Sequence, residues 1–181
     1  MKTLAIYVKE NLVLKNIIYA FLMSVVIALF SRVVVPLPFT PVPVAFQNII
    51  CLMMGVFLGK RTGALAVFFF LVQGMCGLSV FSGGGSGILW LFGPTGGYLL
   101  GYLLGAYVTG SIYEKSRDLL GLTRGLAVGA FVVYLLGAAR LSLLIGCKQA
   151  VLIGVVPFLL VDLLKILGCV GALSIRKKAT R

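Results

Sequence analysis

Two residues of opposite charge, Asp162 and Lys165, lie three positions apart in the otherwise apolar segment VPFLLVDLLKILGCVG (156–171). On a helix this spacing places both side chains on one face, and an acid that precedes a base is the favourable order along the helix dipole. A charge in hydrocarbon costs about 3 kcal/mol or more. The face that carries the pair must therefore point into a helix bundle or a polar cavity. There the pair would offer carboxylate acceptors and ammonium donors to a polar ligand.

The pair also has a simpler interpretation, an internal ion pair that neutralises itself and fixes its helix. Buried ion pairs often fail to recover their desolvation cost, so we favour the ligand-binding interpretation. Other polar residues within apolar segments are few. Gln47 and Asn48 begin one such segment, and Tyr134 lies within another. Gln73 is equally suited to an interhelical hydrogen bond, and Arg140 to snorkelling toward the membrane surface.

The composition indicates an integral membrane protein. Of 181 residues, 61% are hydrophobic and 11% are charged, and the mean hydropathy is +1.15. This charge content is too low to cover a soluble domain. The absence of His from the sequence excludes a His metal site or a His general base. The net charge of +12 indicates topology rather than nucleic-acid binding, because the basic residues lie mainly between apolar segments.

Six segments are apolar enough to predict membrane-spanning helices, which need about 20 residues each. We expect an all-α membrane protein with one domain over residues 1–181. A proline begins three of the segments, where its missing N–H costs nothing. The segments run approximately Asn16–Val35, Pro43–Gly59, Thr62–Val80, Pro94–Tyr113, Gly125–Gly146 and Pro157–Ile175.

The positions of Lys and Arg predict the orientation. Six crossings place four basic groups on one face, which is cytoplasmic by the positive-inside rule, together with both termini. The groups lie before the first segment, at Lys60 and Arg61, between residues 115 and 124, and after the last segment. Lys148 is the one charge in the three connections of the opposite face.

The outer connections are Pro36–Val42, Phe81–Gly93 and Cys147–Val156. The first is rich in proline and the second in glycine. Phe39, Trp90 and Phe92 are large apolar groups that a free loop would leave in water. We therefore expect these loops to fold back as a cap over the bundle.

The first segment carries the small residues Ala20, Ser24 and Ala28 at spacings of four. Such a stripe permits close helix approach. Its partner is either a neighbouring helix of the same chain or another protein.

Several motifs together resemble the BioY family, the biotin-binding S components of energy-coupling-factor (ECF) vitamin transporters. They are PFTPVPVAFQ (38–47), VFSGGGSG (80–87), GPTGGYLLGY (93–102), VYLLG (133–137) and GVVPFLLVDLLK (154–165). Ala45, Arg140 and Val161 depart from the family pattern.

The resemblance implies a transport protein rather than an enzyme, with biotin as transported ligand and no cofactor. Asp162 would accept hydrogen bonds from the ureido N–H groups, and Lys165 would donate to the ureido carbonyl. The other ligand-binding residues that the resemblance and loop positions suggest are Gln47 from the Pro-rich motif, Phe39, Trp90, Phe92 and Tyr134 for the apolar parts of biotin, and Ser86, Gly87 and Thr95 for its carboxylate.

The implied partners are one transmembrane coupling protein and two ATPase subunits, in the plasma membrane of a prokaryote. The stripe of Ala20, Ser24 and Ala28 would dock the coupling protein. Alternatives are an S component for another vitamin, a solitary biotin transporter, an intramembrane enzyme and an ion pathway. The last two are disfavoured, because no nucleophile–base set is visible and the intramembrane charges cluster toward one side.

Overall fold

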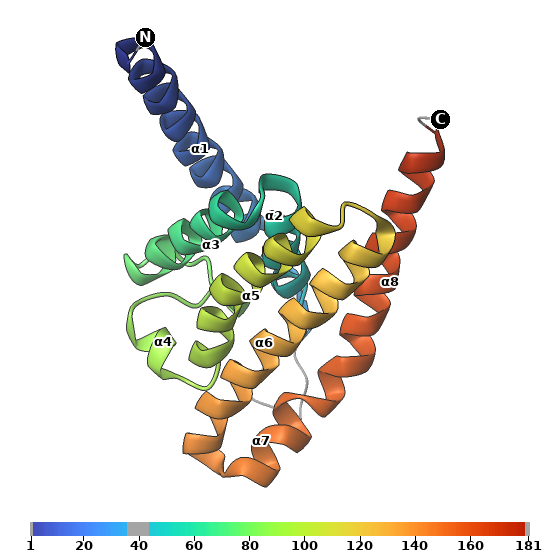
Figure 1. Cartoon of the computed structure of the whole chain (residues 1–181). Helices are drawn as coiled ribbons and strands as arrows, with labels where there is room; N and C mark the ends of the chain where they lie inside the picture. Colours follow the sequence, from blue (N-terminus) through green and yellow to red (C-terminus); the bar gives the residue numbers. More distant parts are fainter. Residues whose placement is uncertain (1, 36–43, 180–181) are drawn as a thin grey trace.

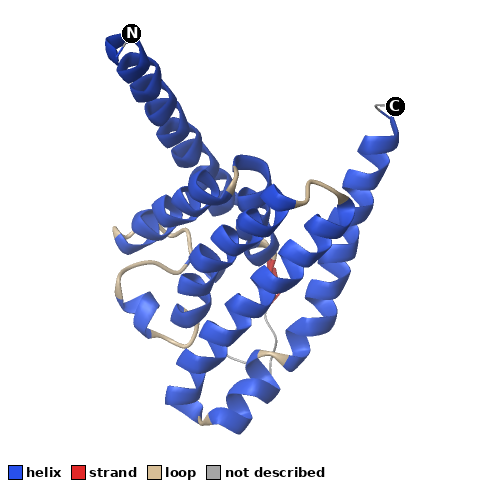
Figure 2. Ribbon diagram, in the orientation of Figure 1, coloured by secondary structure: helices blue, strands red, loops and turns tan. Residues whose placement is uncertain are grey.

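The computed structural model describes the backbone of residues 2–35 and 44–179, and the side chains of residues 12–34 and 45–171. Within these ranges the chain is almost entirely helical (Figure 2). Two short strands, β1 (Val34–Val35) and β2 (Val44–Ala45), pair antiparallel. The longer helices are α1 (Lys2–Phe30), α2 (Gln47–Leu58), α3 (Lys60–Met75), α5 (Gly96–Lys115), α6 (Leu119–Ile145) and α8 (Val156–Ala179), and the shorter ones are η1 (Ser82–Gly84), α4 (Leu89–Phe92) and α7 (Cys147–Gly154).

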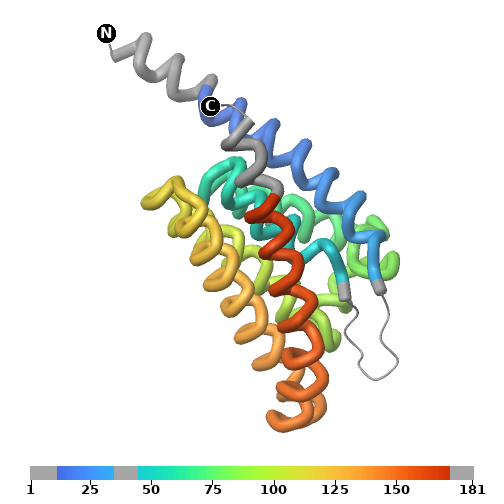
Figure 3. The backbone as a smooth tube through the Cα atoms, turned by 90° about the vertical axis from the view of Figure 1, so that its right-hand side faces the viewer, coloured from blue at the N-terminus to red at the C-terminus, as the bar shows by residue number. Residues whose placement is uncertain are grey.

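The long helices form a tilted bundle (Figures 1 and 3). α5 and α6 lie side by side, and α8 follows the opposite side of α6. α1 packs on α3, and its N-terminal part projects away from the other helices. Figure 1 places the start of α1, the α2–α3 turn, the α5–α6 connection and the end of α8 at one end of the bundle. α7 lies at the other end.

Each of the six predicted segments contains a helix, but the lengths differ. Within the described residues, three stretches are long and apolar enough to cross a membrane: Leu12–Phe30, Leu119–Ile145 and Cys147–Gly171. α2 is apolar but has only 12 residues, and α3 has 16. The all-α fold is therefore confirmed and its three apolar stretches fit a membrane protein, whereas six crossings stay a prediction.

One detail of the prediction was wrong. Residues 147–156, expected to be a connection, contain α7, because Ala150 and Gly154 are buried against α6 and α5. The helix predicted approximately from Pro94 begins at Gly96, which agrees with the approximate bound. Pro43 and the Pro-rich connection lie outside the described residues.

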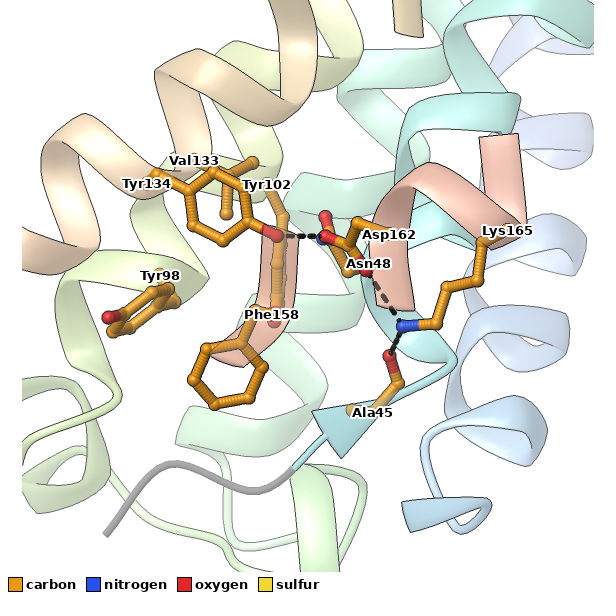
Figure 4. Close-up of a pocket in the computed structure, with 9 residues that line it drawn as sticks. All are labelled: Ala45, Asn48, Tyr98, Tyr102, Val133, Tyr134, Phe158, Asp162 and Lys165. Atoms are coloured by element: carbon orange, nitrogen blue, oxygen red, sulfur yellow. Dashed lines mark hydrogen bonds and ion pairs between the residues drawn. The ribbon is translucent and has the colours of Figure 1, made fainter. Parts of the chain in front are cut away.

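Small residues allow α5 and α6 to approach closely. A Cβ added at Gly101 would lie 2.8 Å from the Cα atom of Val133, and one added at Gly129 would lie 2.0 Å from Oγ1 of Thr109. Both distances are below van der Waals contact, so only glycine fits. This approach brings Tyr102 on α5 and Tyr134 on α6 to the same side of the bundle, where they face α8 (Figure 4).

The glycine-rich connection is anchored to the bundle at one end. Phe81 is fully buried, and its ring packs edge-on against Phe70 with centroids 5.7 Å apart. The hydroxyl of Ser82 donates to Oε1 of Gln47 at 3.0 Å. The other end of the connection is open, since Leu89 and Phe92 are 79% and 63% exposed.

Candidate functional site

A small pocket lies where α2, α5, α6 and α8 meet beside strand β2 (Figure 4). It is about 30 Å³ in volume, which is room for one or two water molecules. Its wall combines one charged pair, one amide and three tyrosines with apolar side chains. The lining residues are Ala45, Asn48, Tyr98, Tyr102, Val133, Tyr134, Phe158, Asp162 and Lys165.

Asp162 is the acidic centre of the pocket, and its side chain is nearly buried. Lys165 donates to Oδ1 at 2.9 Å, and Nδ2 of Asn48 donates to Oδ2 at 2.5 Å. The hydroxyl of Tyr134 also donates to Oδ2. Three donors from three helices therefore surround one carboxylate, which compensates for its removal from water.

Lys165 connects α8 to strand β2. Besides the carboxylate, its Nζ donates to the backbone carbonyl of Ala45 at 2.9 Å. The ammonium also lies 5.4 Å from the centre of the Phe46 ring, within the range of a cation–π interaction. The pairing of Ala45 with Val34 fixes the position of this carbonyl, so the hairpin forms part of the site.

Helix geometry explains why Phe158, Asp162 and Lys165 reach the pocket together. They stand at positions i, i+4 and i+7 of α8 and share one face. The opposite face carries Leu160, Leu164 and Leu167, all more than half exposed. α8 thus presents polar groups inward and leucines outward, the arrangement that a charged pair in a membrane helix requires.

The tyrosines form the side of the pocket nearest α5 and α6. The hydroxyl of Tyr98 donates to the carbonyl of Gly154 at 2.6 Å, which links α5 to the end of α7. Tyr102 lies one helical turn further along α5 and lines the same pocket. These rings supply flat apolar surfaces beside the charged pair, a combination suited to a compact polar ring system.

A second, larger hollow adjoins the pocket. It has a volume of about 280 Å³ and an almost entirely apolar wall between α6 and α8. Tyr134 and Asp162 line both spaces, so their hydrogen bond separates the polar pocket from the apolar groove.

The structure brings three of the predicted ligand-binding residues together: Asp162, Lys165 and Tyr134. Gln47 is close in sequence to the pocket but does not line it. Its side chain is fully buried, and Oε1 accepts the hydrogen bond from Ser82. Gln47 therefore holds the glycine-rich connection against α2.

The predicted residues of the glycine-rich connection do not line the pocket. Trp90 packs over Gly85 of the same connection. The N–H of Gly87, predicted to bind a carboxylate, donates to the carbonyl of Gly74 at 2.8 Å. Ser86 and Thr95 also lie outside the lining. Phe39 falls outside the described residues.

The predicted docking stripe is internal in this structure, which corrects that assignment. Ala20 and Ser24 are fully buried, and Ala28 is partly buried against the core. Oγ of Ser24 accepts a hydrogen bond from Nε2 of Gln73 on α3 at 2.8 Å. The small residues thus serve the close approach of α1 to α3.

Sequence reasoning missed part of the site. The sequence identifies Asn48 as an intramembrane polar residue but does not assign it to the ligand. Tyr98 and Tyr102 belong to the motif GPTGGYLLGY, and their spacing of four places both on one face of α5. That spacing, together with Tyr134, was the signal that could have identified the aromatic wall.

Comparison with known proteins gives consistent matches. A sequence model of the BioY family matches residues 2–181. A biotin transporter BioY from Thermotoga maritima is 34% identical over 145 residues, which cover 79% of this chain and 86% of that protein. A probable biotin transporter BioY from Pyrococcus horikoshii is 33% identical over 125 residues, covering 69% and 74%.

A solved structure matches as well. It is the crystal structure of the S-component for biotin from an ECF-type ABC transporter. The TM-score is 0.81 at 29% identity, and the match covers 93% of each chain. The helical arrangement described above is therefore shared with a protein of known structure over almost its full length.

Proposed function

The chain belongs to the BioY family, and from this premise we propose that it is the membrane-embedded, biotin-binding S component of an ECF-type transporter. The observation that carries the proposal is the pair Asp162 and Lys165, buried among helices and facing a pocket with three tyrosines. The relatives' names describe transport, and we assign the chain no catalytic step.

The chemistry of biotin matches this pocket. The ureido ring carries two N–H donors and one carbonyl acceptor. The ammonium of Lys165 can donate to the carbonyl, and the carboxylate side of the pocket can accept from N–H. Tyr98, Tyr102 and Phe158 offer apolar surface for the fused thioether ring. A site that pairs both kinds of group discriminates against analogues that lack one, because its own polar atoms would stay unpaired.

The size of the pocket requires movement on binding. A volume of about 30 Å³ does not admit a bicyclic molecule. Lys165 has a flexible four-carbon stem, and Phe158 and Lys165 both belong to α8, so displacement of α8 would enlarge the site. We place the conformational change of binding at this helix.

The arrangement of the bundle supports the orientation that the sequence predicts. In Figure 1 the α2–α3 turn with Lys60 and Arg61 lies at the same end as the start of α1 and the end of α8. We propose that this end is cytoplasmic, that both termini are inside, and that the chain is a single multi-pass domain of a prokaryotic plasma membrane.

Uptake would need partner subunits. The glycine-rich sequence GGGSG lacks the G-K-[ST] ending of a nucleotide-binding loop, so we assign energy supply to other chains. The proposed partners are one transmembrane coupling protein and two ATPases. Because Ala20 and Ser24 are buried, docking would use the outward apolar face of α1, where Leu22 and Leu29 are exposed.

Calorimetry on the detergent-purified protein tests the proposal. The wild type should bind biotin, and Asp162→Asn and Lys165→Ala should each weaken binding at least tenfold. Asp118→Asn is a matched control, because Asp118 caps α6 far from the pocket and Asn caps equally well. Lys148→Ala, an exposed lysine on α7, is the control for the second variant.

Three outcomes are informative. Binding of biotin by the wild type and both controls, with loss in the two pocket variants, supports the proposal. Unchanged binding in both pocket variants would contradict this site. Failure of the wild type to bind biotin, together with a different vitamin found by mass spectrometry in the purified protein, would contradict the ligand.

A further inference from the structure

The side chain of Asn48 leaves a buried polar atom in the pocket without a partner among the described residues. Only 8% of the surface of Asn48 is exposed, and its Nδ2 donates a hydrogen bond to the carboxylate of Asp162. Its carbonyl oxygen, Oδ1, is buried and has no hydrogen-bond partner among the described residues. Leaving a buried acceptor unpaired costs about 1–3 kcal/mol, so such an atom indicates a function.

The orientation of this amide is fixed by its neighbour. A rotation that exchanged Nδ2 and Oδ1 would place the carbonyl oxygen of Asn48 against the carboxylate oxygen of Asp162, both of which are acceptors. The observed orientation is the one that gives Asp162 a donor. Oδ1 of Asn48 therefore points away from the carboxylate of Asp162 and stays available to accept a hydrogen bond.

Asp162 itself is largely occupied. Oδ2 already accepts from Asn48 and from Tyr134, and Oδ1 accepts from Lys165. A carboxylate offers about four lone-pair positions, so at most one is left. A ligand N–H that used Asp162 would have to share or displace existing donors, whereas Oδ1 of Asn48 has no donor to displace.

Lys165 provides the complementary group. Its ammonium carries three protons, and the described residues accept two of them, at Asp162 and at the carbonyl of Ala45. The third N–H is left for an acceptor. Oδ1 of Asn48 is thus an unused acceptor and the third N–H of Lys165 an unused donor, and both side chains are held by bonds to the same carboxylate.

We propose that Asn48 is a ligand-contacting, specificity-determining residue whose Oδ1 accepts an N–H of the ligand, while Lys165 donates to the adjacent carbonyl. The ligand class that this pattern selects is a cyclic urea, in which N–H and C=O are neighbours. Asp162 is then the positioning residue that holds both contacts. This inference rests on the proposed function and adds the residue that recognises the N–H edge.

The test is a thermodynamic cycle between protein and ligand. Calorimetry would compare biotin with its two mono-N-methyl derivatives, each lacking one ureido N–H, on the wild type and on Asn48→Ala. In the wild type, methylation of the nitrogen that faces Asn48 should weaken binding about 10-fold to 100-fold, the loss expected for a buried hydrogen bond. The Asn48→Ala variant should bind unmodified biotin about 10-fold to 100-fold more weakly than the wild type does. In this variant the same methylation should lower the affinity by less than about threefold.

Two further variants keep the result interpretable. Asn48→Ser is a second, smaller change if Asn48→Ala is poorly folded, and thermal unfolding reports the folding of each. Asn16 is an exposed asparagine on α1, and Asn16→Ala is the control. It should match the wild type in its affinity for biotin and in the effect of each methylation.

The calorimetric results distinguish failure of this inference from failure of the proposed function. If the same methylation costs Asn48→Ala as much as it costs the wild type, Asn48 acts only through Asp162 and the inference is overturned, while biotin binding stands. If neither methylation weakens the wild type, no protein acceptor receives the ureido N–H and the inference is also overturned. If the wild type does not bind biotin, the proposed function fails first.

Discussion

Substitution of Lys165 by Met measures what the buried pair contributes to the fold. Met keeps the length of the side chain and removes the charge. Asp162 would keep its bonds from Asn48 and Tyr134 but would lose the opposite charge 2.9 Å away. Both side chains of the pair are less than one-tenth exposed, so solvent cannot replace the lost partner.

The magnitude follows from this geometry. Removing one partner of a buried ion pair costs about 3–5 kcal/mol. Because two donors remain on the carboxylate, we expect the lower limit, about 3 kcal/mol. For a chain of this size that loss lowers the unfolding midpoint by roughly 6–12 °C. The double variant Asp162→Asn/Lys165→Met removes both charges and should recover most of the stability, to within about 1.5 kcal/mol of the wild type.

Thermal unfolding in detergent without added ligand is the assay, with Lys148→Met as the control for the loss of an exposed lysine. A midpoint for Lys165→Met equal to that of the control would refute the reasoning, because it would mean that the pair is solvated. A double variant as unstable as the sum of the two single variants would also refute it, because the two charges would then be uncoupled.

Three other changes test the remaining contacts. Tyr134→Phe removes one donor from the carboxylate and should lower stability by about 1–2 kcal/mol in thermal unfolding. Gly101→Ala should lower stability by about 1–3 kcal/mol because its Cβ would press against α6, whereas Gly168→Ala, which meets open space, should be neutral or stabilising. Glu114→Gln tests the α2–α3 turn. The backbone N–H of Lys60 holds the pKa of Glu114 below its usual 4.5. The wild type should therefore be more stable than Glu114→Gln above about pH 4.5, and the difference should disappear as pH falls through the lowered pKa.

A specific outcome would contradict each of these three predictions. A Tyr134→Phe protein as stable as wild type would show that the short contact to the carboxylate contributes little. Equal effects at the two glycines would show that α5 and α6 are not closely packed. A stability difference between Glu114→Gln and wild type that persists unchanged to pH 3 would exclude the ionised carboxylate as its source.

The sequence predicts which polar residues matter in this protein better than it predicts which residues they contact. Asp162 and Lys165 stand out because charges are costly in apolar helices, and that cost is independent of the fold. The same reasoning singled out Asn48 as polar but could not tell which neighbour it would meet. Its bond to Asp162 joins residues 114 positions apart, and only the packing of α2 against α8 creates it.

The sequence specifies the partners of loops and small residues less well. The sequence Ala20-x-x-x-Ser24 permits close packing, but the pattern is the same whether the partner is α3 or another protein. Trp90 was expected to cover the pocket because exposed aromatic groups are costly. In the structure it packs on Gly85 of its own loop, a local contact that loop composition does not reveal.

The most direct test of the central claim is an experimental structure of the protein with biotin bound. The account predicts the ureido carbonyl oxygen within about 3 Å of Nζ of Lys165, a hydrogen-bond distance, with the ring between α8 and the tyrosines of α5 and α6. Biotin bound beside the glycine-rich connection, with its ureido carbonyl outside hydrogen-bond distance of Lys165, would contradict it.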